Sequence, residues 1–401
     1  MYGEQSGFYR EYWAVFDPAI SNQPDGNRWR VNDPAVSLHP KWGTRWEGKA
    51  NGLMLISIDE DLFNLRAAQL YLELWGGHPH TRNKQVILNG KATYTLPEAG
   101  TQAGHCTYSY PELPIDLNHL VSGTNALQFR CERGSGFWGH YIIDQAAIRC
   151  DYQPDHPALR DLQGFAPQII TSIEEDQIRI SLQGAQLDKY PITRVTYLGR
   201  YSDFDDRGEN RTDGWHGFTR GRVWQNAVGS ATQPPFEVNW DVTMIPDQPR
   251  DMALCALIDF ANGLKYRTFA AGVALPPRPY TVRLYNPVDL PKPFWSRAGE
   301  QRETTLELDL APDQIEAAVL CVKVWDGGEG SVANPFLLNE HPYSVTSGRA
   351  THDVVFTKTA VDPDHLKHGE NRFTLLSDTE HHGIEVLLPG PCLKIKSSPR
   401  E

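Results

Sequence analysis

The sequence lacks three features that define large classes of protein. It has no run of about 18 apolar residues, so no membrane-spanning helix is expected. The start, MYGEQSGFYREYW, has neither a basic region nor an apolar region, so no signal peptide is visible; the chain is expected to be cytoplasmic, or secreted with the signal removed. Basic residues number 38 against 50 acidic ones, and the net charge of −12 repels phosphate backbones, so nucleic acid is not an expected partner.

Catalytic motifs are missing as well: there is no nucleophile elbow, P-loop, GxGxxG after a strand, or HExxH. None of the six cysteines falls in a CxxC pair, which argues against a zinc knuckle or a thioredoxin-type site. Cys131 and Cys150 lie on two apolar strands, and Cys321 and Cys392 flank the last third of the chain. Two interpretations stay open: a disulfide in each pair if the protein is exported, or buried free thiols.

What the sequence does contain is alternation. Runs such as LYLELW, FEVNW and LCVKVW alternate with period two, and no stretch longer than about two turns keeps helical spacing. Glycine (33) and proline (29) are plentiful, as many turns require. At 401 residues the chain is too long for one small core and predicts two to three domains. These patterns predict an all-β protein.

An internal repeat divides the chain. Near residue 70 the sequence reads LYLELWGGHPHTRNKQVILNGK, and near residue 320 it reads LCVKVWDGGEGSVANPFLLNEH. Each stretch predicts a strand ending in Trp (Trp75, Trp325), a turn with Gly, and a strand ending in Leu-Asn (Asn89, Asn339). Both copies continue through an Asp-x-x-x-Leu segment, a Gly-x-Asn turn and two further strands. The agreement in order and spacing indicates duplication of one module.

Three passages carry a family resemblance: LNG at Leu88–Gly90, DLNHLVSGTNAL at Asp116–Leu127 and DPDHLKHGENRFTL at Asp362–Leu375. They resemble the galactose-binding-like β-sandwich, a jelly-roll module common among carbohydrate-binding modules and appended to many glycan-active enzymes. The resemblance covers roughly Gly48–Tyr152 and Thr304–Ser398, and it implies a β-sandwich in each range. In the Gly-x-Asn turn, both the Gly and the Asn are expected to accept a positive φ.

The middle of the chain resembles a bacterial immunoglobulin-like domain in Gly229–Asp241, where a small-residue turn leads to a strand ending in Trp-Asp. It continues to Asn262-Gly263, which predicts a hairpin. The predicted fold is therefore all-β, with three β-sandwich domains in the order jelly roll, Ig-like, jelly roll. Their predicted bounds are 1–152 with a Trp-rich leader, 165–275 with an acidic insertion at 202–222, and 300–398.

The acidic insertion reads SDFDDRGENRTDGWHGFTRGR. Calcium binds carboxylate, amide and backbone oxygens on a loop that folds around it, and the predicted ligands are Asp203, Asp205, Glu209, Asn210 and Asp213. The loop is not an EF-hand, because Arg207 occupies a ligand position and Gly214 stands where the bidentate Glu belongs. Ca²⁺ is the one predicted cofactor. The alternatives are a solvated loop carrying Arg–Asp pairs, a brace against a neighbouring module, and part of a catalytic site.

Aromatic and histidine side chains gather in and near the first module. Sugars stack their C–H faces on Trp and Tyr, and their hydroxyl groups pair with Asp, Asn, Arg and His. The predicted ligand-binding residues are Trp29, Trp42 and Trp46 in the leader, His78 and His80 around Pro79, and Trp138 and His140 in a later turn. Histidines would also suit metal or acid–base chemistry where they converge; a surface or structural role is the alternative for each.

Glycoside hydrolysis uses paired carboxylates about 5–10 Å apart. The acids that would supply such a pair are Asp17, Asp33, Glu47, Glu112, Asp144, Glu380 and Glu385. None stands out in the sequence from ordinary loop acids, so no catalytic residue is predicted.

These observations favour a glycan-binding or accessory protein of carbohydrate metabolism, with an oligo- or polysaccharide as its partner. Two other functions stay open: a glycoside hydrolase or polysaccharide lyase with its site between modules, and a structural or assembly protein. Binding predicts an exposed row of Trp or Tyr, and catalysis predicts a deep cleft with two converging acids, or with His or Tyr beside Arg. Assembly predicts a large apolar patch or a homo-oligomer interface.

Overall fold

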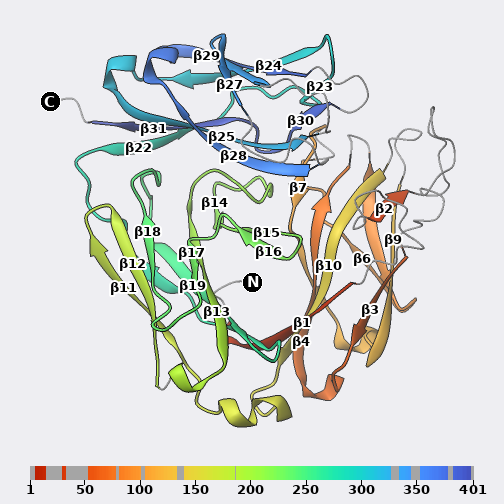
Figure 1. Cartoon of the computed structure of the whole chain (residues 1–401). Helices are drawn as coiled ribbons and strands as arrows, with labels where there is room; N and C mark the ends of the chain where they lie inside the picture. Colours follow the sequence, from red (N-terminus) through yellow and green to blue (C-terminus); the bar gives the residue numbers. More distant parts are fainter. Residues whose placement is uncertain are drawn as a thin grey trace.

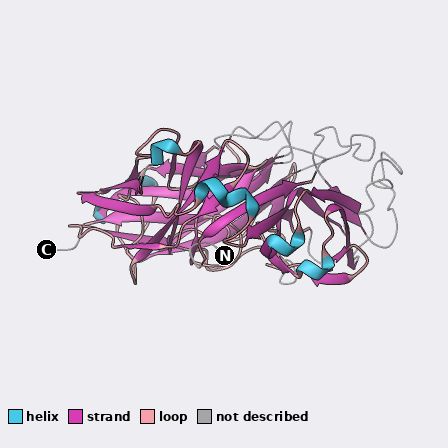
Figure 2. Cartoon of the chain, turned by 90° about the horizontal axis from the view of Figure 1, so that it is seen from below, coloured by secondary structure: helices cyan, strands magenta, loops and turns pink. Residues whose placement is uncertain are grey.

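Strands form almost all of the regular structure in the computed structural model, and the helical segments in its described part are short 3₁₀ turns (Figure 2). The structure describes residues 5–14, 29–32, 53–77, 81–100, 104–132, 140–185, 187–326, 334–344, 353–377 and 383–398. The predicted all-β fold is confirmed. The period-two pattern is visible in the strand Leu53–Ile58, whose residues alternate between exposed and buried, because successive side chains point to opposite faces of a sheet. In the described part, no helix is long and apolar enough to cross a membrane.

The N-terminal strands form the right-hand side of Figure 1, in red to orange. They are β1 (Gly7–Trp13), β2 (Trp29–Asn32), β3 (Leu53–Ile58), β4 (Leu65–Trp75), β5 (Arg82–Leu88), β6 (Ala92–Thr95), β7 (Tyr108–Ser109), β8 (Glu112–Ile115), β9 (Gly123–Glu132) and β10 (His140–Tyr152), with 3₁₀ turns η2 (Leu62–Asn64) and η3 (Leu117–His119). One sheet has the order β3-β9-β5-β6, and β10 pairs with β4 in a second sheet. Apolar residues such as Leu70, Leu127 and Ile148 pack in the core that these strands share.

The middle strands lie on the left and in the centre of Figure 1, in yellow to green. They are β11 (Gln168–Glu174), β12 (Gln177–Gln183), β13 (Ile192–Ser202), β14 (Asp213–Trp215), β15 (Phe218–Arg220), β16 (Val223–Gln225), β17 (Gly229–Ala231), β18 (Val238–Asp241), β19 (Met252–Phe260), β20 (Lys265–Arg267) and β21 (Ala271–Val273), with η5 (Pro157–Leu162) and η6 (Leu187–Lys189). The hairpin predicted at Asn262-Gly263 is confirmed between β19 and β20, where Gly263 has a φ of +80°.

One large sheet joins the N-terminal and middle strands, along the path β14-β13-β19-β20-β1-β10-β4-β7. Strand β1 is the link, since it pairs with β10 on one side and with β20 on the other. A single apolar core continues across the link and includes Leu70 of β4 and Leu254 of β19. The two segments therefore share a sheet and a core, a fusion that the sequence did not indicate. The predicted domain bounds stay a prediction.

The C-terminal strands lie above the other two groups in Figure 1, in blue. They are β22 (Thr281–Tyr285), β23 (Trp295–Ser296), β24 (Gln301–Leu308), β25 (Ile315–Asp326), β26 (Phe336–Leu338), β27 (His341–Tyr343), β28 (Asp353–Val361), β29 (Gly369–Leu376), β30 (Ile384–Val386) and β31 (Cys392–Ser397), with η7 (Pro312–Gln314) and η8 (Pro363–His365). They form two sheets, β22-β31-β25-β30-β23 and β24-β29-β26-β27, around a separate core that includes Leu320 and Phe373.

The two ends of the chain share a strand order, because β3-β9-β5-β6 is matched by β24-β29-β26-β27. The Gly of each Gly-x-Asn turn has a positive φ, as predicted: +97° at Gly123 and +84° at Gly369. The expectation for the Asn was wrong. Asn125 and Asn371 lie in extended strands, β9 and β29, and both are fully buried.

The side-chain amide of each buried Asn holds its turn together through hydrogen bonds. The Asn125 amide donates to the backbone oxygen of Val121 at 2.8 Å, and the Asn89 amide donates to Oδ1 of Asn125 at 2.8 Å. At the other end of the chain the corresponding bonds have the same lengths, and they join Asn371 to Lys367 and Asn339 to Asn371. Buried polar groups are satisfied by such bonds, so the turn depends on the amide.

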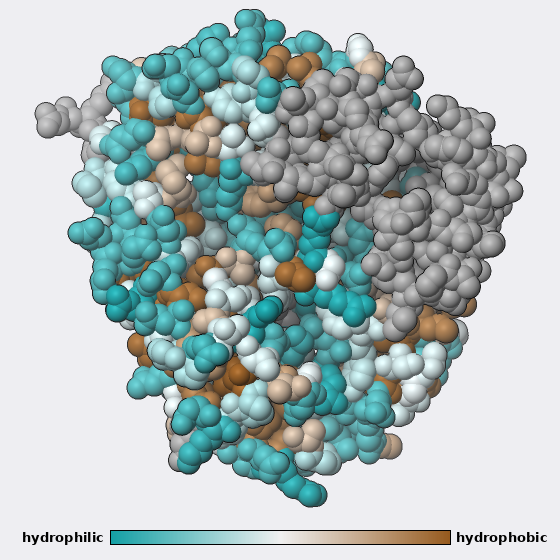
Figure 3. All heavy atoms as spheres, viewed as in Figure 1, coloured by the Kyte–Doolittle hydropathy of each residue, from teal (hydrophilic) through white to brown (hydrophobic). Residues whose placement is uncertain are grey.

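All six cysteines are buried free thiols in the structure, in place of the two disulfides considered above. Cys321 and Cys392 lie directly opposite each other on β25 and β31. On the face seen in Figure 3, the described residues are mainly hydrophilic, and apolar residues are scattered among them.

Candidate functional site

The acidic insertion lies between the three groups of strands, and its segments 203–208 and 216–219 are buried. Figure 1 shows β14, β15 and β16 in the middle of the molecule, beneath the C-terminal strands and beside the N-terminal ones. Asp203 is 4% exposed and Asp206 is 1% exposed. The solvated-loop alternative is therefore wrong for the buried segments 203–208 and 216–219, while residues 210–212 and 220–222 are exposed as that alternative expects.

Hydrogen bonds tie the insertion to both ends of the chain. The Lys323 ammonium of β25 donates to the backbone oxygens of Asp206 (2.7 Å) and Tyr108 (3.0 Å). Arg207 donates to the backbone oxygen of Tyr110 at 3.1 Å, and Lys394 forms an ion pair with Asp203. Lys323 thus links the C-terminal sheet, the insertion and β7 at one point.

Lys323 is a buried cation among aromatic rings. Its Nζ lies 4.9 Å from the ring centre of Tyr110, 5.2 Å from that of Phe218 and 5.5 Å from that of Tyr108. Burial lowers the pKa of Lys323 to about 8, although Asp206 and Asp205 favour its charged form. The cation–π contacts and the two carbonyl bonds replace the water that burial removes.

A second buried pair sits inside the insertion. His216 Nδ1 lies 3.3 Å from Oδ1 of Asp206, and Asn226 also donates to this carboxylate. Burial alone would raise the pKa of Asp206, but the His216 charge and these bonds hold it at about 2. The same carboxylate raises the pKa of His216 against the effect of burial. Each member of the pair thus favours the charged form of the other.

The tip of the insertion is anchored to β4. The Glu73 carboxylate accepts hydrogen bonds from Thr219 Oγ1 (2.8 Å), from the Gly221 amide (2.9 Å) and from the Arg222 amide (3.1 Å). Burial raises the pKa of Glu73, and these bonds oppose the shift. The insertion thus contacts strands from both ends of the chain, as the brace alternative expects.

The five predicted calcium ligands do not gather around one point. Asp203 pairs with Lys394, Asp213 pairs with Arg250, and Glu209 lies 3.4 Å from Arg207. Asp205 accepts from the Arg211 amide at 3.1 Å, and Asn210 has a φ of +59°. Within the described ranges no three acidic, His or Cys side chains are arranged to hold a metal ion. These residues do not fit a calcium site as they lie, and calcium binding stays a prediction.

Most of the predicted sugar-binding side chains lie outside the described residues: Trp42, Trp46, His78, His80 and Trp138. For Trp29 the structure describes the backbone, in β2. His140 is placed at the start of β10, 2% exposed, with its ring centre 5.5 Å from that of Trp75. The surface that these residues were expected to form stays a prediction.

Three of the seven candidate acids are described: Glu112, Asp144 and Glu385. Arg149 binds Glu112 at 2.6 Å and, although burial alone would raise the pKa of this carboxyl, the guanidinium keeps it low. Asp144 accepts from the Tyr108 hydroxyl at 2.7 Å. Asp17, Asp33, Glu47 and Glu380 lie outside the described residues.

Glu385 is the acid with the most altered environment of the three. It lies in β30, opposite Trp295 and Trp325, and it is 2% exposed. The thiol of Cys106 and the indole of Trp75 face its carboxyl group from the N-terminal strands. Burial raises the pKa of Glu385 to about 7, and these two neighbours oppose the shift. A carboxyl group with this pKa is half protonated near neutral pH, as a general acid requires.

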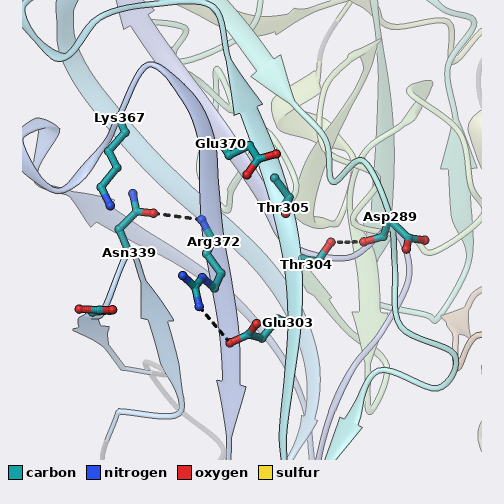
Figure 4. A pocket seen from close by; sticks show the side chains of 9 residues that line it. Asp289, Glu303, Thr304, Thr305, Asn339, Lys367, Glu370 and Arg372 are labelled. Atoms are coloured by element: carbon teal, nitrogen blue, oxygen red, sulfur yellow. Dashed lines mark hydrogen bonds and ion pairs between the residues drawn. The ribbon is translucent and has the colours of Figure 1, made fainter.

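A pocket of about 410 Å³ opens on the C-terminal sheet β24-β29-β26-β27. Nine polar or charged residues line it: Asp289, Glu303, Thr304, Thr305, Asn339, Glu340, Lys367, Glu370 and Arg372. They come from β24, from β29 and the loop before it, from the turn between β26 and β27, and from the loop between β22 and β23. Figure 4 shows these side chains around one space, with Asp289 on one side and Lys367 on the other.

Several of the lining residues are joined by hydrogen bonds and an ion pair. Arg372 lies 3.8 Å from Glu303, which also accepts from Thr374 at 3.3 Å (Figure 4). Thr304 donates to the backbone oxygen of Asp289, and the Arg372 amide donates to Oδ1 of Asn339 at 3.0 Å. The Asn339–Asn371 bond described above therefore holds one wall of the pocket.

The N-terminal strands carry apolar residues at two positions that match pocket residues. Asn125 corresponds to Asn371, so Ala126 stands where Arg372 does, and Leu55 opposite it stands where Thr305 does. Leu55 is 50% exposed. Sequence reasoning missed all nine pocket residues, because charged residues at alternate positions of a strand look like an ordinary solvent face. The signal lay in comparing the two copies, which differ in charge at these positions.

Comparison with known proteins assigns no family. No protein-family model and no curated protein matches the chain. Among solved structures, a β-porphyranase of glycoside hydrolase family 86 from Bacteroides plebeius is similar over 60% of this chain and 38% of its own, with 12% identity and a TM-score of 0.26. A β-glucuronidase from an uncultured Clostridium species matches 73% of this chain and 47% of its own, with 9% identity and a TM-score of 0.19.

A β-glucuronidase from Ruminococcus gnavus gives similar values: 11% identity, a TM-score of 0.19, and coverage of 70% of this chain and 45% of the other. The chain spans less than half the length of each of these enzymes. At such scores the likeness carries no argument about function, which has to come from the chain itself.

Proposed function

We propose that this chain binds a carbohydrate in the pocket on its C-terminal sheet. One observation carries the proposal: all nine residues that line the pocket have side chains that donate or accept hydrogen bonds. An apolar ligand would leave these groups unpaired, which is costly. A sugar, whose hydroxyl groups both donate and accept, satisfies carboxylate, amide, hydroxyl, ammonium and guanidinium groups together.

Size and rigidity support the same ligand class. The volume of about 410 Å³ falls within the range of roughly 300–1,000 Å³ typical of small-molecule sites. The strands β24 and β29 pair over the full length of β24, and buried Asn371 fixes the loop at Lys367. A site carried by paired strands holds its groups in place before the ligand arrives, which lowers the entropic cost of binding.

We also infer that the two ends of the chain are duplicated galactose-binding-like modules around an Ig-like middle segment. The shared strand order and the shared hydrogen bonds of Asn89–Asn125 and Asn339–Asn371 support this inference. On this view the C-terminal module is the one that acquired a polar site, and the N-terminal module became joined to the middle segment through β1.

The test is a glycan array followed by calorimetry on the full chain. We expect at least one oligosaccharide class to bind, and Arg372→Ala to weaken that binding by about tenfold or more, because a charge-assisted hydrogen bond is lost. Arg130→Ala is the matched control, since Arg130 is an exposed Arg on β9 of the other module. Absence of binding to every glycan, or equal loss in both variants, would contradict the proposal.

A second candidate function is cleavage of a glycan, favoured by one observation. Glu385 is a buried carboxyl beside Trp75, and burial raises its pKa to about 7, so it can hold a proton at neutral pH. Tyr108, which lies opposite Trp75 in the sheet, donates to Asp144, a second carboxylate on the N-terminal side. In this function Glu385 would donate a proton to the leaving group, and Asp144 would be the second carboxylate of the pair.

Reducing-sugar and unsaturated-product assays on diverse polysaccharides test the second candidate. We expect activity to fall as pH rises through about 7, where Glu385 loses its proton. Glu385→Gln should abolish turnover and keep sugar binding. Turnover that is unchanged in this variant, or that shows the same pH profile, would eliminate Glu385 as the acid.

A further inference from the structure

Negative charge exceeds positive charge around the pocket. Arg372 is paired with Glu303 at 3.8 Å, so these two side chains neutralise each other. Three carboxylates and one ammonium remain on the lining: Asp289, Glu340, Glu370 and Lys367. Among the described residues, none of these four side chains forms an ion pair. The lining therefore carries a surplus of two negative charges.

The sheet beside the pocket adds to this surplus. Glu370 on β29 lies directly opposite Glu307 on β24, and both are exposed. Like charges at facing positions on neighbouring strands are destabilising. In the N-terminal module the same two positions hold Thr124 and Ser57, whose hydroxyl groups share a hydrogen bond of 3.1 Å. The C-terminal module thus replaces a neutral pair by two repelling carboxylates at the edge of its pocket.

We infer that the carbohydrate bound in this pocket bears an ammonium group, as an amino sugar with a free amine does. This inference rests on the carbohydrate-binding function proposed above. A positive group beside Glu370 relieves its repulsion with Glu307 and gains charge-assisted hydrogen bonds to the carboxylates of the lining. The negative group of a uronate or a sulfated sugar is repelled by the carboxylates of the lining. Its cationic partners would be Lys367 and Arg372, two groups against the four carboxylates of the lining.

Calorimetry on the full chain with three oligosaccharides of equal length tests the inference. They are an oligomer of glucosamine, its N-acetylated counterpart, and an oligomer of galacturonate. We expect the glucosamine oligomer to bind about tenfold or more tightly than the acetylated one, the uronate to show no binding, and added salt to weaken the amine complex.

Two variants locate the effect. Glu370→Gln should weaken binding of the glucosamine oligomer several-fold and leave the acetylated oligomer unaffected, and its unfolding temperature should not fall, because a repulsion is removed. Asp188→Asn, which removes an exposed carboxylate in η6 of the middle segment, is the control and should change neither value.

The outcomes separate the two proposals. Equal binding of the amine and acetylated oligomers, or tighter binding of the uronate, overturns the amino-sugar inference and leaves carbohydrate binding standing. If no oligosaccharide of any of the three classes or on the glycan array binds, the proposed function falls, and the inference falls with it.

Discussion

Replacing Glu385 by Gln should make the stability of this protein less dependent on pH. The carboxyl group is buried between β30 and the N-terminal strands, and its pKa rises from 4.5 to about 7 on folding. The unfolded state therefore holds its proton less tightly than the folded state does. Stability due to this group is fully present below pH 4.5 and is lost as pH rises through about 7.

The pKa values give the size of the effect. One pKa unit corresponds to about 1.4 kcal/mol, so the rise from 4.5 to about 7 corresponds to roughly 3 kcal/mol between acidic and mildly alkaline solution. Gln has nearly the same shape and carries no charge, so Glu385→Gln avoids the cost of burying a carboxylate. We expect the variant to match the parent protein near pH 5 and to exceed its stability near pH 8 by roughly 3 kcal/mol.

Urea unfolding followed by tryptophan fluorescence, at several pH values between about 5 and 8, measures this difference. Glu300→Gln is the control, because Glu300 lies in the same C-terminal module with 47% of its side chain exposed, and this change should leave the pH dependence intact. If Glu385→Gln followed the parent protein at every pH, or lost the same stability near pH 5 and pH 8, the burial argument would be refuted.

Three further predictions concern the insertion and the two modules. Asp206→Asn should cost about 3–5 kcal/mol in urea unfolding, because it breaks a buried pair and leaves His216 buried without its carboxylate partner; loss below 1 kcal/mol would contradict this reading. Asn125→Ala and Asn371→Ala should each cost about 1–3 kcal/mol by leaving buried groups unpaired, and a cost in one module alone would refute the shared role. Calcium titration decides the ion prediction: bound Ca²⁺ would raise the unfolding temperature, and a double change of Asp203→Ala with Asp205→Ala would abolish the rise.

Sequence reasoning reached the parts of the fold that depend on neighbours along the chain. The alternation in LYLELW and LCVKVW predicted β4 and β25, and Asn262-Gly263 predicted the hairpin between β19 and β20. The repeat also identified the turns at Gly123 and Gly369 correctly. The positive φ expected for the Asn two positions later was wrong. The burial of its amide depends on tertiary contacts, which the local sequence does not show.

The candidate sites depended on distant contacts. In the sequence, Glu385 is one of seven candidate acids. In the structure, β30 places it beside Trp75 and Cys106, which lie more than 270 residues earlier in the chain. In the sequence, the pocket residues resemble the solvent-facing side of a strand. In the structure, the turn at Asn339 and the loop at Lys367 line the same pocket. The acids of the insertion resemble calcium ligands in the sequence. In the structure, two of them form ion pairs, Asp203 with Lys394 and Asp213 with Arg250.

The sequence by itself determined that this protein is built of strands and where tight turns such as those at Gly123, Gly263 and Gly369 fall. It also predicted a module shared by the two ends, a prediction that the matching strand order supports. Each of these follows from side-chain alternation or from the local backbone freedom of Gly and Asn. The tertiary structure decided that β1 joins two segments in one sheet, that the acidic insertion contacts both ends of the chain, and which carboxyl groups change their pKa. Burial and Coulomb interactions depend on distance in space, and the order of residues along the chain does not contain that distance.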